Sequence, residues 1–331
     1  MPHHTMISCT VCRAPDAREL NMPHSSSLSK ILWIGFFSLT FLTLSPAFAQ
    51  DSNAQKEEQK DVQEQSVRTP KKTGWRTKLG IGYRTTPIGL ALFNDTGYRK
   101  QLSTSDNLLL KNTYIEGGAV TMTSPAYFRT GGYLELVPLS VLKLRTNIQA
   151  AQFYGTYGFL MVPDDQQNPD WTVDEQQANA DRGEGFPGQT FYWQSMATPR
   201  IKVGPVAALV DLRYMYVRHN AAGAAYDPSW DTLFKNQDHY FSATPTLGFL
   251  PVENDNTYLL TAARYEYVRV FGYDLRSSQV NALVIWGIPK SWVKGYNLSL
   301  TGLFGYWLKH PQERTNTTYL AFQIGATFGA Q

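Results

Sequence analysis

The sequence predicts an all-β protein: a transmembrane antiparallel up-and-down β-barrel of about twelve strands, with ten or fourteen strands also fitting. Three observations predict this fold class. A short apolar segment near the start has the form of a secretory signal, twelve later segments alternate between two kinds of side chain, and the closing segment Thr318–Phe328 carries one wholly apolar face. A period of two is typical of a strand whose two faces meet different surroundings.

The secretory signal is the first of these features. Residues 31–44 are apolar or carry hydroxyl groups, Lys30 precedes them, and the small residues Ala47 and Ala49 follow. This order predicts a signal peptide that is cleaved after Ala49. The alternative is one membrane-spanning helix, but the fourteen residues of this segment fall short of the ~20 that a span requires.

The alternating segments begin near Trp75. In the clearest of them, Lys143 and Arg145 share one face while Leu142 and Leu144 share the other. Lipid-facing and lumen-facing residues alternate in this way along the strands of a membrane barrel. The twelve expected strands are 75–84, 87–99, 107–120, 126–137, 140–154, 189–203, 205–218, 239–250, 257–270, 278–288, 295–308 and 317–328.

The connections between these segments alternate in length. The short ones are 138–139, 204–205, 251–256 and 289–294. The long and polar ones are 155–188, 219–238, 271–277 and 309–316. Short turns at one end and long loops at the other are typical of barrels in the bacterial outer membrane, where the long loops lie outside the cell.

The signal, the alternating segments and the apolar closing strand resemble bacterial outer-membrane β-barrel proteins as a class, over about residues 75–331. No single named family is matched. The resemblance implies residence in the bacterial outer membrane, with outer-membrane lipid, lipopolysaccharide and the barrel-assembly machinery as partners. One departure concerns the end of the chain. Such proteins usually end on an aromatic residue, whereas three residues follow Phe328 here.

The resemblance divides the chain into four parts. Since Met22 gives the signal an ordinary length, we expect residues 1–21 to be a misassigned start and 22–49 to be the signal peptide. Residues 50–72 have almost no large apolar side chains and are expected to form a flexible periplasmic tail, and residues 73–331 the barrel. Cys9 and Cys12 have the spacing of a redox pair or half a zinc site, but they precede the expected cleavage site.

Aromatic residues support a membrane position. Many lie near segment ends on the expected outer face, where aromatic girdles form at the two membrane interfaces. The core of a soluble β-sandwich would instead place them at strand centres. The set comprises Trp75, Tyr83, Phe128, Tyr154, Phe191, Trp193, Tyr214, Tyr216, Phe241, Tyr265, Tyr267, Trp286, Tyr296, Phe304, Tyr306 and Phe328.

The expected inner face is strongly basic. The whole chain is nearly balanced, with 30 Lys and Arg against 27 Asp and Glu, which does not favour a nucleic-acid partner. The inner face, however, holds eleven basic and five acidic residues: Arg76, Lys78, Arg84, Arg99, Arg129, Lys143, Arg145, Arg200, Lys202, Arg213, Arg264, Asp95, Glu116, Glu135, Asp211 and Glu266. This excess favours a pore for anionic solutes. The alternative is a salt-bridged interior that fills a narrow barrel, in which Asp211 would pair with Arg213 and Arg264 with Glu266.

Four of these cations are expected to form one track. Lys143 and Arg145 share a face of one strand, and Arg200 and Lys202 share a face of the next. Because the two strands are expected to be antiparallel neighbours, the four side chains would meet on one wall. Glu135 is expected to neutralise Lys143 or Arg145 and to leave the others free. Such a track would attract a small anionic solute, such as an acidic sugar or an organic acid.

Catalytic and metal-binding patterns are weak. His219 and His239 flank the 219–238 loop, but no spacing motif supports the serine, histidine and acid arrangement of a hydrolase. Asp170, Asp174 and Glu175 could bind Ca²⁺, yet they lack the regular spacing of a dedicated site. We therefore predict no catalytic residue, no metal and no cofactor, and no nucleic-acid partner.

Three functions fit the sequence. The favoured one is a narrow channel with a basic lumen for small anionic solutes. The alternatives are a closed structural or interaction barrel with a salt-bridged interior and, least favoured, an outer-membrane rim enzyme. The predicted pore-lining residues are Lys143, Arg145, Arg200, Lys202, Arg213, Arg264, Arg129, Glu135, Asp211 and Glu266.

Overall fold

The computed structural model describes residues 73–85, 88–155, 162, 170–183, 187–254, 256–293 and 296–330. The misassigned start, the signal peptide and the flexible tail, expected at 1–21, 22–49 and 50–72, lie outside the described residues. Contacts divide the chain into Met1–Ser66 and Val67–Gln331, and the second unit contains the whole fold described below. None of the helices in the described part of the chain is long and apolar enough to cross a membrane.

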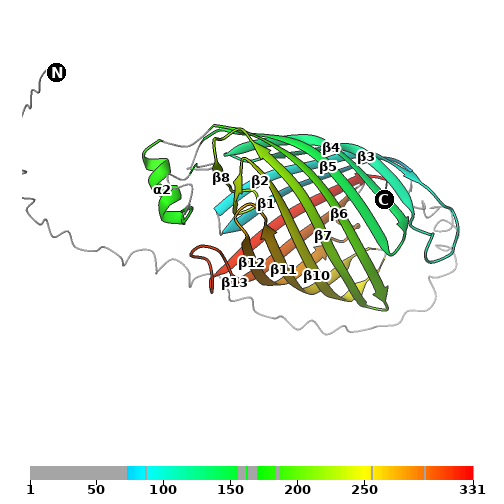
Figure 1. Ribbon diagram of the computed structural model, residues 1–331. Helices are drawn as coiled ribbons and strands as arrows, with labels where there is room; N and C mark the ends of the chain where they lie inside the picture. Colours follow the sequence, from blue (N-terminus) through cyan, green and yellow to red (C-terminus); the bar gives the residue numbers. More distant parts are fainter. Residues whose placement is uncertain are drawn as a thin grey trace, which may run out of the picture. The chain divides into compact units, whose positions relative to one another are not determined.

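Twelve antiparallel strands form a closed barrel (Figure 1). Each strand pairs with its neighbours along the barrel, and β1 pairs with β14 to close it. Closure leaves no free sheet edge, and it confirms both the predicted fold class and the strand number. The strands are β1 (Gly74–Thr85), β2 (Ile88–Gln101), β3 (Tyr114–Thr123), β4 (Tyr127–Leu139), β5 (Leu142–Phe153), β6 (Gln189–Val203), β7 (Val206–His219), β10 (Gln237–Glu253), β11 (Tyr258–Val270), β12 (Leu275–Gly287), β13 (Asn297–Lys309) and β14 (Thr318–Gly329).

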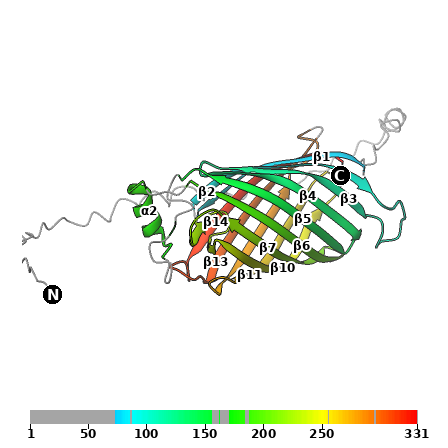
Figure 2. The same cartoon turned by 45° about the horizontal axis from the view of Figure 1, so that its top comes forward.

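Two further elements lie in the long connections. Strands β8 (Ala224–Asp227) and β9 (Thr232–Lys235) form a separate hairpin between β7 and β10. Helix α2 (Val173–Asp181) lies between β5 and β6, and the Thr172 side chain caps it by accepting a hydrogen bond from the Glu175 N–H. Both connections lie at one end of the barrel, which we call the loop end (Figure 2). The opposite end, where the two chain ends of the barrel lie, is called the turn end.

The third strand begins later than the sequence predicted. The alternation placed it at 107–120, whereas β3 begins at Tyr114 and residues 102–113 form a connection at the turn end. The Asn107 side chain accepts a hydrogen bond from the Leu109 N–H, and the Asn107 carbonyl accepts from Leu110 and Lys111. This local turn ends any extended conformation, although its leucines continue an apolar pattern. The expected contrast between short turns and long loops is therefore looser among the first strands.

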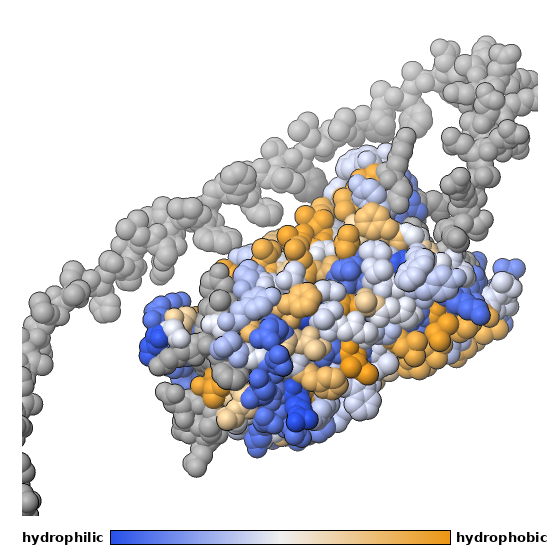
Figure 3. Space-filling view, turned by 90° about the horizontal axis from the view of Figure 1, so that it is seen from above, coloured by the Kyte–Doolittle hydropathy of each residue, from blue (hydrophilic) through white to orange (hydrophobic). Residues whose placement is uncertain are grey.

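The barrel is apolar outside and polar inside. Alternate residues such as Leu92, Ile148, Phe304 and Phe322 point outward and are each more than half exposed, at 51%, 55%, 52% and 55%. Figure 3 shows apolar side chains running along the visible outer wall. An apolar surface of this extent is typical of a protein that meets lipid. Of the aromatic residues predicted on the outer face, Trp75, Trp193 and Phe304 are exposed at 68%, 50% and 52%.

Inward-facing aromatic rings lie across glycines of the neighbouring strand. A Cβ atom on Gly80 would overlap the ring of Phe93, and a Cβ on Gly305 would overlap the ring of Tyr319. Each glycine faces the aromatic residue directly in the strand register. Glycine at these positions therefore lets a large ring lie flat on the inner wall of the barrel.

Candidate functional site

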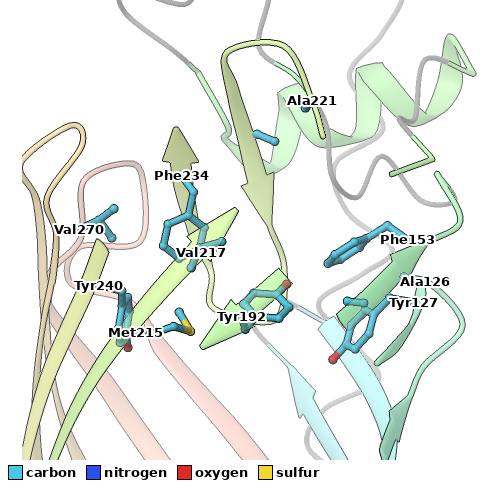
Figure 4. Close-up of a cluster of buried hydrophobic side chains, with 12 residues drawn as sticks. Ala126, Tyr127, Phe153, Tyr192, Met215, Val217, Ala221, Phe234, Tyr240 and Val270 are labelled. Atoms are coloured by element: carbon cyan, nitrogen blue, oxygen red, sulfur yellow. The ribbon is translucent and has the colours of Figure 1, made fainter. Parts of the chain in front are cut away.

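The β8–β9 hairpin occupies the barrel mouth at the loop end. Its residues Tyr226, Leu233 and Phe234 are 0% exposed. Phe234 belongs to a buried cluster with inward-facing residues of the barrel strands, including Val217 and Tyr240, as Figure 4 shows. Since these partners point into the lumen, the hairpin is packed inside the barrel wall. The sequence predicted only a loop in this region.

The described part of the β5–β6 connection covers the hairpin. Trp171 is 2% exposed and packs in a second cluster with Tyr226 and Leu233. The backbone N–H of Val173 donates a hydrogen bond of 2.6 Å to Glu313 in the β13–β14 connection. These contacts place the described part of the long loop over the mouth.

A buried charged group fastens the hairpin to the β13–β14 connection, and we call it the latch. It consists of Asp231, Tyr226, His310 and Arg314. Asp231, in the left-handed region with φ of 52°, forms an ion pair with Arg314 and accepts a hydrogen bond of 2.9 Å from the Tyr226 hydroxyl. His310 Nε2 lies 3.8 Å from Asp231 Oδ2.

The surroundings of the latch shift two pKa values. Burial favours a neutral Asp231, but the positive charges of Arg314 and Arg84 outweigh it, so the pKa of Asp231 falls below its ordinary value. Burial lowers the pKa of His310 to about 4, although Asp231 opposes this shift. Asp231 is thus held charged and His310 neutral.

The hairpin tip carries Trp230 into a group of cations and aromatic rings. The guanidinium carbons of Arg213 and Arg129 lie 5.1 and 5.7 Å from the Trp230 ring centroid. The rings of Tyr240 and Tyr192 lie 5.5 and 6.5 Å from the same ring. Four strands and the hairpin tip meet here. We call these five residues the mouth site.

The two arginines of the mouth site lack an acidic partner. Arg129 is 8% exposed and donates one hydrogen bond, of 3.3 Å, to the Met122 sulfur. Its Nε and Nη1 atoms, and Nε of Arg213, form no hydrogen bond within the described chain. Neither side chain forms an ion pair there. Burying a cation without a partner is costly, so the mouth site is arranged to accept a negative charge.

Asp227 of the hairpin is the carboxyl group whose charge reaches Arg129. It is 1% exposed and accepts a hydrogen bond from the Tyr192 hydroxyl. Burial raises the pKa of Asp227, against the effect of its hydrogen bonds from Tyr192 and Ser229. Even when Asp227 is charged, the two arginines of the mouth site outnumber this carboxyl group, so an excess of positive charge remains.

Toward the turn end the lumen arginines are paired. Glu116 lies 2.7 Å from Arg99 and 3.5 Å from Arg76, and it accepts a hydrogen bond of 2.7 Å from the Tyr133 hydroxyl. Glu116 is 2% exposed. This carboxylate therefore neutralises and orders two cations from β1 and β2.

The expectation of free cations on the four-cation track is wrong for one of its members, Lys202, and the neutralised member Arg145 has a second partner that was not predicted. Arg145 lies 3.5 Å from Glu135, as predicted, but it also lies 2.9 Å from Asp95. Lys202 pairs with Glu253. Asp95 comes from β2 and Glu253 from the end of β10, so both acids reach the track from strands that are not adjacent to it. Neighbour pairing alone could not anticipate these contacts.

Of the two remaining predicted ion pairs, one forms and the other does not. Arg264 and Glu266 form an ion pair of 2.8 Å, as the sequence suggested. Asp211 instead accepts a hydrogen bond of 2.6 Å from Thr198, and within the described chain it forms no ion pair with Arg213. Arg213 belongs to the mouth site, which explains why the predicted pair does not form.

Five of the predicted pore-lining cations lie at two levels of the barrel. Arg129 and Arg213 belong to the mouth site. Lys143, Arg200 and Lys202 lie within a few residues of the turn end of their strands. The Nε atom of Arg200 donates to the Ser140 carbonyl at 3.0 Å. That these residues line a conducting path stays a prediction.

The aromatic half of the mouth site was not predicted from the sequence. Tyr192 lies in β6 between Phe191 and Trp193, so both faces of that strand are aromatic and alternation could not separate them. Tyr240 follows the outward His239 in the same way. Trp230 is the single tryptophan of the 219–238 loop, and that unusual position was the one available signal.

The two histidines that flank the hairpin do not come together in an arrangement that resembles a catalytic site. His219 is 3% exposed and points inward, with Nε2 at 3.2 Å from the Phe234 carbonyl. His239 points outward and lies 2.7 Å from the Tyr214 hydroxyl. The barrel wall separates them, so they do not meet at the rim. Groups of three or more potential metal ligands are absent from the described residues.

Comparisons with known proteins give structural likenesses alone. No family model and no curated protein matches the chain. The β domain of the Bordetella autotransporter BrkA shares 12% identity over 78% of this chain and 99% of its own, with a TM-score of 0.45. The translocator domain of autotransporter NalP from Neisseria meningitidis shares 11% over 81% and 92%, with 0.41. The NanC porin shares 8% over 76% and 98%, with 0.39.

At these identities and TM-scores the likenesses say nothing about function. The class follows from the barrel itself, which is closed, antiparallel, apolar outside and charged inside. These properties define a bacterial outer-membrane β-barrel protein. The chain is such a protein, and its place is the outer membrane.

Proposed function

We propose that this barrel is a narrow channel for small anionic solutes and that the mouth site recognises them. The observation that carries the proposal is the pair Arg129 and Arg213, which lie among aromatic rings without an ion-pair partner in the described chain. A carboxylate or phosphate would supply the missing acceptors, since guanidinium groups bind both through paired hydrogen bonds.

The rest of the mouth site supports a solute with a ring or an apolar face. Trp230, Tyr192 and Tyr240 come from the hairpin, β6 and β10 and present flat surfaces around the two arginines. The hairpin narrows the mouth, which restricts passage to small molecules. An acidic sugar or a small aromatic or aliphatic acid has the required combination of charge and surface.

The hairpin also supports a second candidate, a closed structural barrel. Tyr226, Leu233 and Phe234 are fully buried in the mouth, and the latch fastens the turn between them. In this case the arginines would serve only to hold Trp230 through cation–π contacts. The two candidates differ in one measurable property, which is whether ions pass.

Single-channel recording of the refolded protein in a planar bilayer separates the candidates. In a salt gradient we expect a reversal potential that indicates anion preference. The double variant Arg129→Gln, Arg213→Gln should lose most of this preference, and Arg129→Lys, Arg213→Lys should retain it. Lys100→Gln, which changes an exposed cation on β2, is the matched control and should behave like the native protein.

A variant in which residues 221–235 are replaced by a short Gly-Ser linker completes the test. It should show larger conductance than the native protein because the mouth is no longer narrowed. If neither the native protein nor this variant conducts, while both are folded, the channel is refuted and the closed barrel is supported.

A further inference from the structure

Four cations lie at the rim of the loop end, three of them on the outer face of barrel strands. Arg218 follows the buried inward residue Val217 and precedes His219, so its own side chain points outward. Arg269 of β11 and Arg276 of β12 lie opposite each other in the register. Lys235 ends β9 and is exposed. We call these four residues the rim cluster.

The rim cluster lies at the edge of the apolar belt. Along β7 the outward residues preceding Arg218 are Leu212, Tyr214 and Tyr216, of which Leu212 is 37% and Tyr214 44% exposed. The His239 ring stacks on Tyr214 at the same level, with centroids 5.7 Å apart. Aromatic residues of this kind mark the interface between hydrocarbon and lipid headgroups. The rim cluster therefore lies at the height of the headgroups.

The positive charge of the rim cluster is only partly balanced. Asp274 is shared by two cations, at 2.9 Å from Arg269 and 3.0 Å from Arg276, and the three side chains stay 57%, 38% and 46% exposed. Arg218 forms no ion pair within the described chain. Lys235 Nζ lies 4.8 Å from the Tyr273 ring centroid. One carboxylate thus faces a surplus of cations.

A second acidic residue near the rim cluster, Asp238, already accepts hydrogen bonds from backbone groups. Asp238 is 2% exposed and accepts hydrogen bonds from the backbone N–H groups of Lys235, His239 and Gly272. These bonds fix the β11–β12 turn beside the start of β10, so the rim cluster is held on a rigid base. They also use the Asp238 carboxylate, which is directed inward and does not neutralise the outer surface.

The opposite side of the loop end lacks such cations. The described outward positions there, on β1 to β5, are apolar or uncharged, as at Tyr83, Ile88, Leu90 and Phe128. A general preference for basic residues at a membrane interface would act on all sides of the barrel. The exposed cations are confined to the side of the loop end that runs from β7 to β13, where Lys309 at the end of β13 is exposed as well, and this indicates a localised binding surface.

We propose that the rim cluster binds the phosphate groups of an outer-leaflet glycolipid, that is, of lipopolysaccharide. Guanidinium groups match phosphate oxygens in charge and in their two-pronged geometry. The loop end of such a barrel faces the outer leaflet, and lipid acyl chains can lie against the apolar belt directly below. A phosphate would relieve the repulsion between Arg269 and Arg276 that the single Asp274 leaves.

The test uses the full-length protein, refolded in detergent and titrated with lipopolysaccharide. Binding is followed by the rise in thermal unfolding temperature and by phosphate retained after size-exclusion chromatography. We expect Arg269→Gln, Arg276→Gln to weaken binding at least tenfold, with a further loss on adding Arg218→Gln, whereas the corresponding lysine variants keep most of it. Lys100→Gln is the control, and heat-modifiable gel mobility verifies that every variant is folded.

Three outcomes would overturn the proposal. If enzymatically dephosphorylated lipopolysaccharide raises the unfolding temperature as much as the intact lipid, binding is due to the acyl chains. If inorganic phosphate or phosphatidylglycerol vesicles produce the same shift, the rim cluster has no preference for this lipid. Equal weakening by Lys100→Gln would show that only total charge matters.

Discussion

The two ends of the lumen hold their arginines in different ways. Near the turn end, Arg99 and Arg76 share the buried carboxylate of Glu116. At the loop end, Arg129 and Arg213 lie against the faces of Trp230, and within the described chain they form no ion pair. The same residue type therefore has two roles. Paired arginines join the strands, whereas unpaired arginines keep their capacity to bind an anion.

The largest effect is expected from removing the charge of Glu116. Glu116→Gln leaves Arg99 and Arg76 buried without a counter-charge, which should lower the free energy of unfolding by about 3–5 kcal/mol. Urea unfolding in detergent or vesicles measures this. Glu253→Gln is the matched control. Its pair with Lys202 is about half exposed, so its loss should cost at most about 1 kcal/mol. Equal losses of unfolding free energy in the two variants would show that the buried Glu116 group stabilises the barrel no more than an exposed ion pair does.

A second pair of variants tests which residues of each strand face the lumen and which face the lipid. Leu300 is outward and 36% exposed, and Thr301 is its inward neighbour. Leu300→Arg should reduce folding yield strongly, because a cation at the lipid midplane costs about 2–4 kcal/mol. Thr301→Arg should fold nearly as well as the native protein. Similar yields for both would show that the register is misassigned.

The latch gives the loop end a pH dependence through a histidine, a residue type that the group around Glu116 at the turn end does not contain. The pKa of His310 is lowered to about 4 in the folded protein, so between its ordinary value near 6.5 and pH 4 the unfolded state binds more protons. Stability of the latch therefore falls as the pH falls through this window. The lowered pKa of Asp231 acts in the same direction at still lower pH, where protonation of its carboxylate breaks the pair with Arg314.

Proteolysis of the hairpin between pH 7 and 4 measures this opening. Cleavage within 219–236 should increase as the pH falls, by an amount of the order of 1–3 kcal/mol in the opening free energy. His310→Gln should flatten the dependence above pH 4. Tyr226 and Trp307 also face His310 and Asp231, but neither changes charge in this window. A pH profile that His310→Gln leaves unaltered would exclude the latch as its source.

The sequence predicted the barrel because alternation is a local property of each strand. It did not predict the hairpin, because β8 and β9 have four residues each and are buried only through the wall around them. The contact of Arg145 with Asp95 was missed for a related reason, since β5 and β2 are separated by two strands. Arg129 and Arg213 were predicted as inward cations. Their lack of an ion-pair partner in the described chain was not predicted, because it depends on which side chains fill the lumen around them.

The smallest effect on stability is expected in the mouth site itself. Arg129→Met keeps much of the side-chain volume and contact with Met122 while removing a buried charge that has no ion-pair partner in the described chain. The free energy of unfolding should change by less than about 1 kcal/mol, or rise, because the cost of burying the cation disappears. Arg99→Met, which removes a paired cation, should instead destabilise by about 3 kcal/mol or more.

The same variant should have the larger functional effect. Under the proposed function, Arg129→Met removes one of the two groups that bind the anion, so anion preference in a planar bilayer should fall although the protein stays folded. Arg99→Met should weaken folding with little change in the preference of the molecules that do fold. If Arg129→Met costs as much stability as Arg99→Met, Arg129 is a structural residue like Arg99. The two ends of the lumen would then not differ in the way their charges suggest.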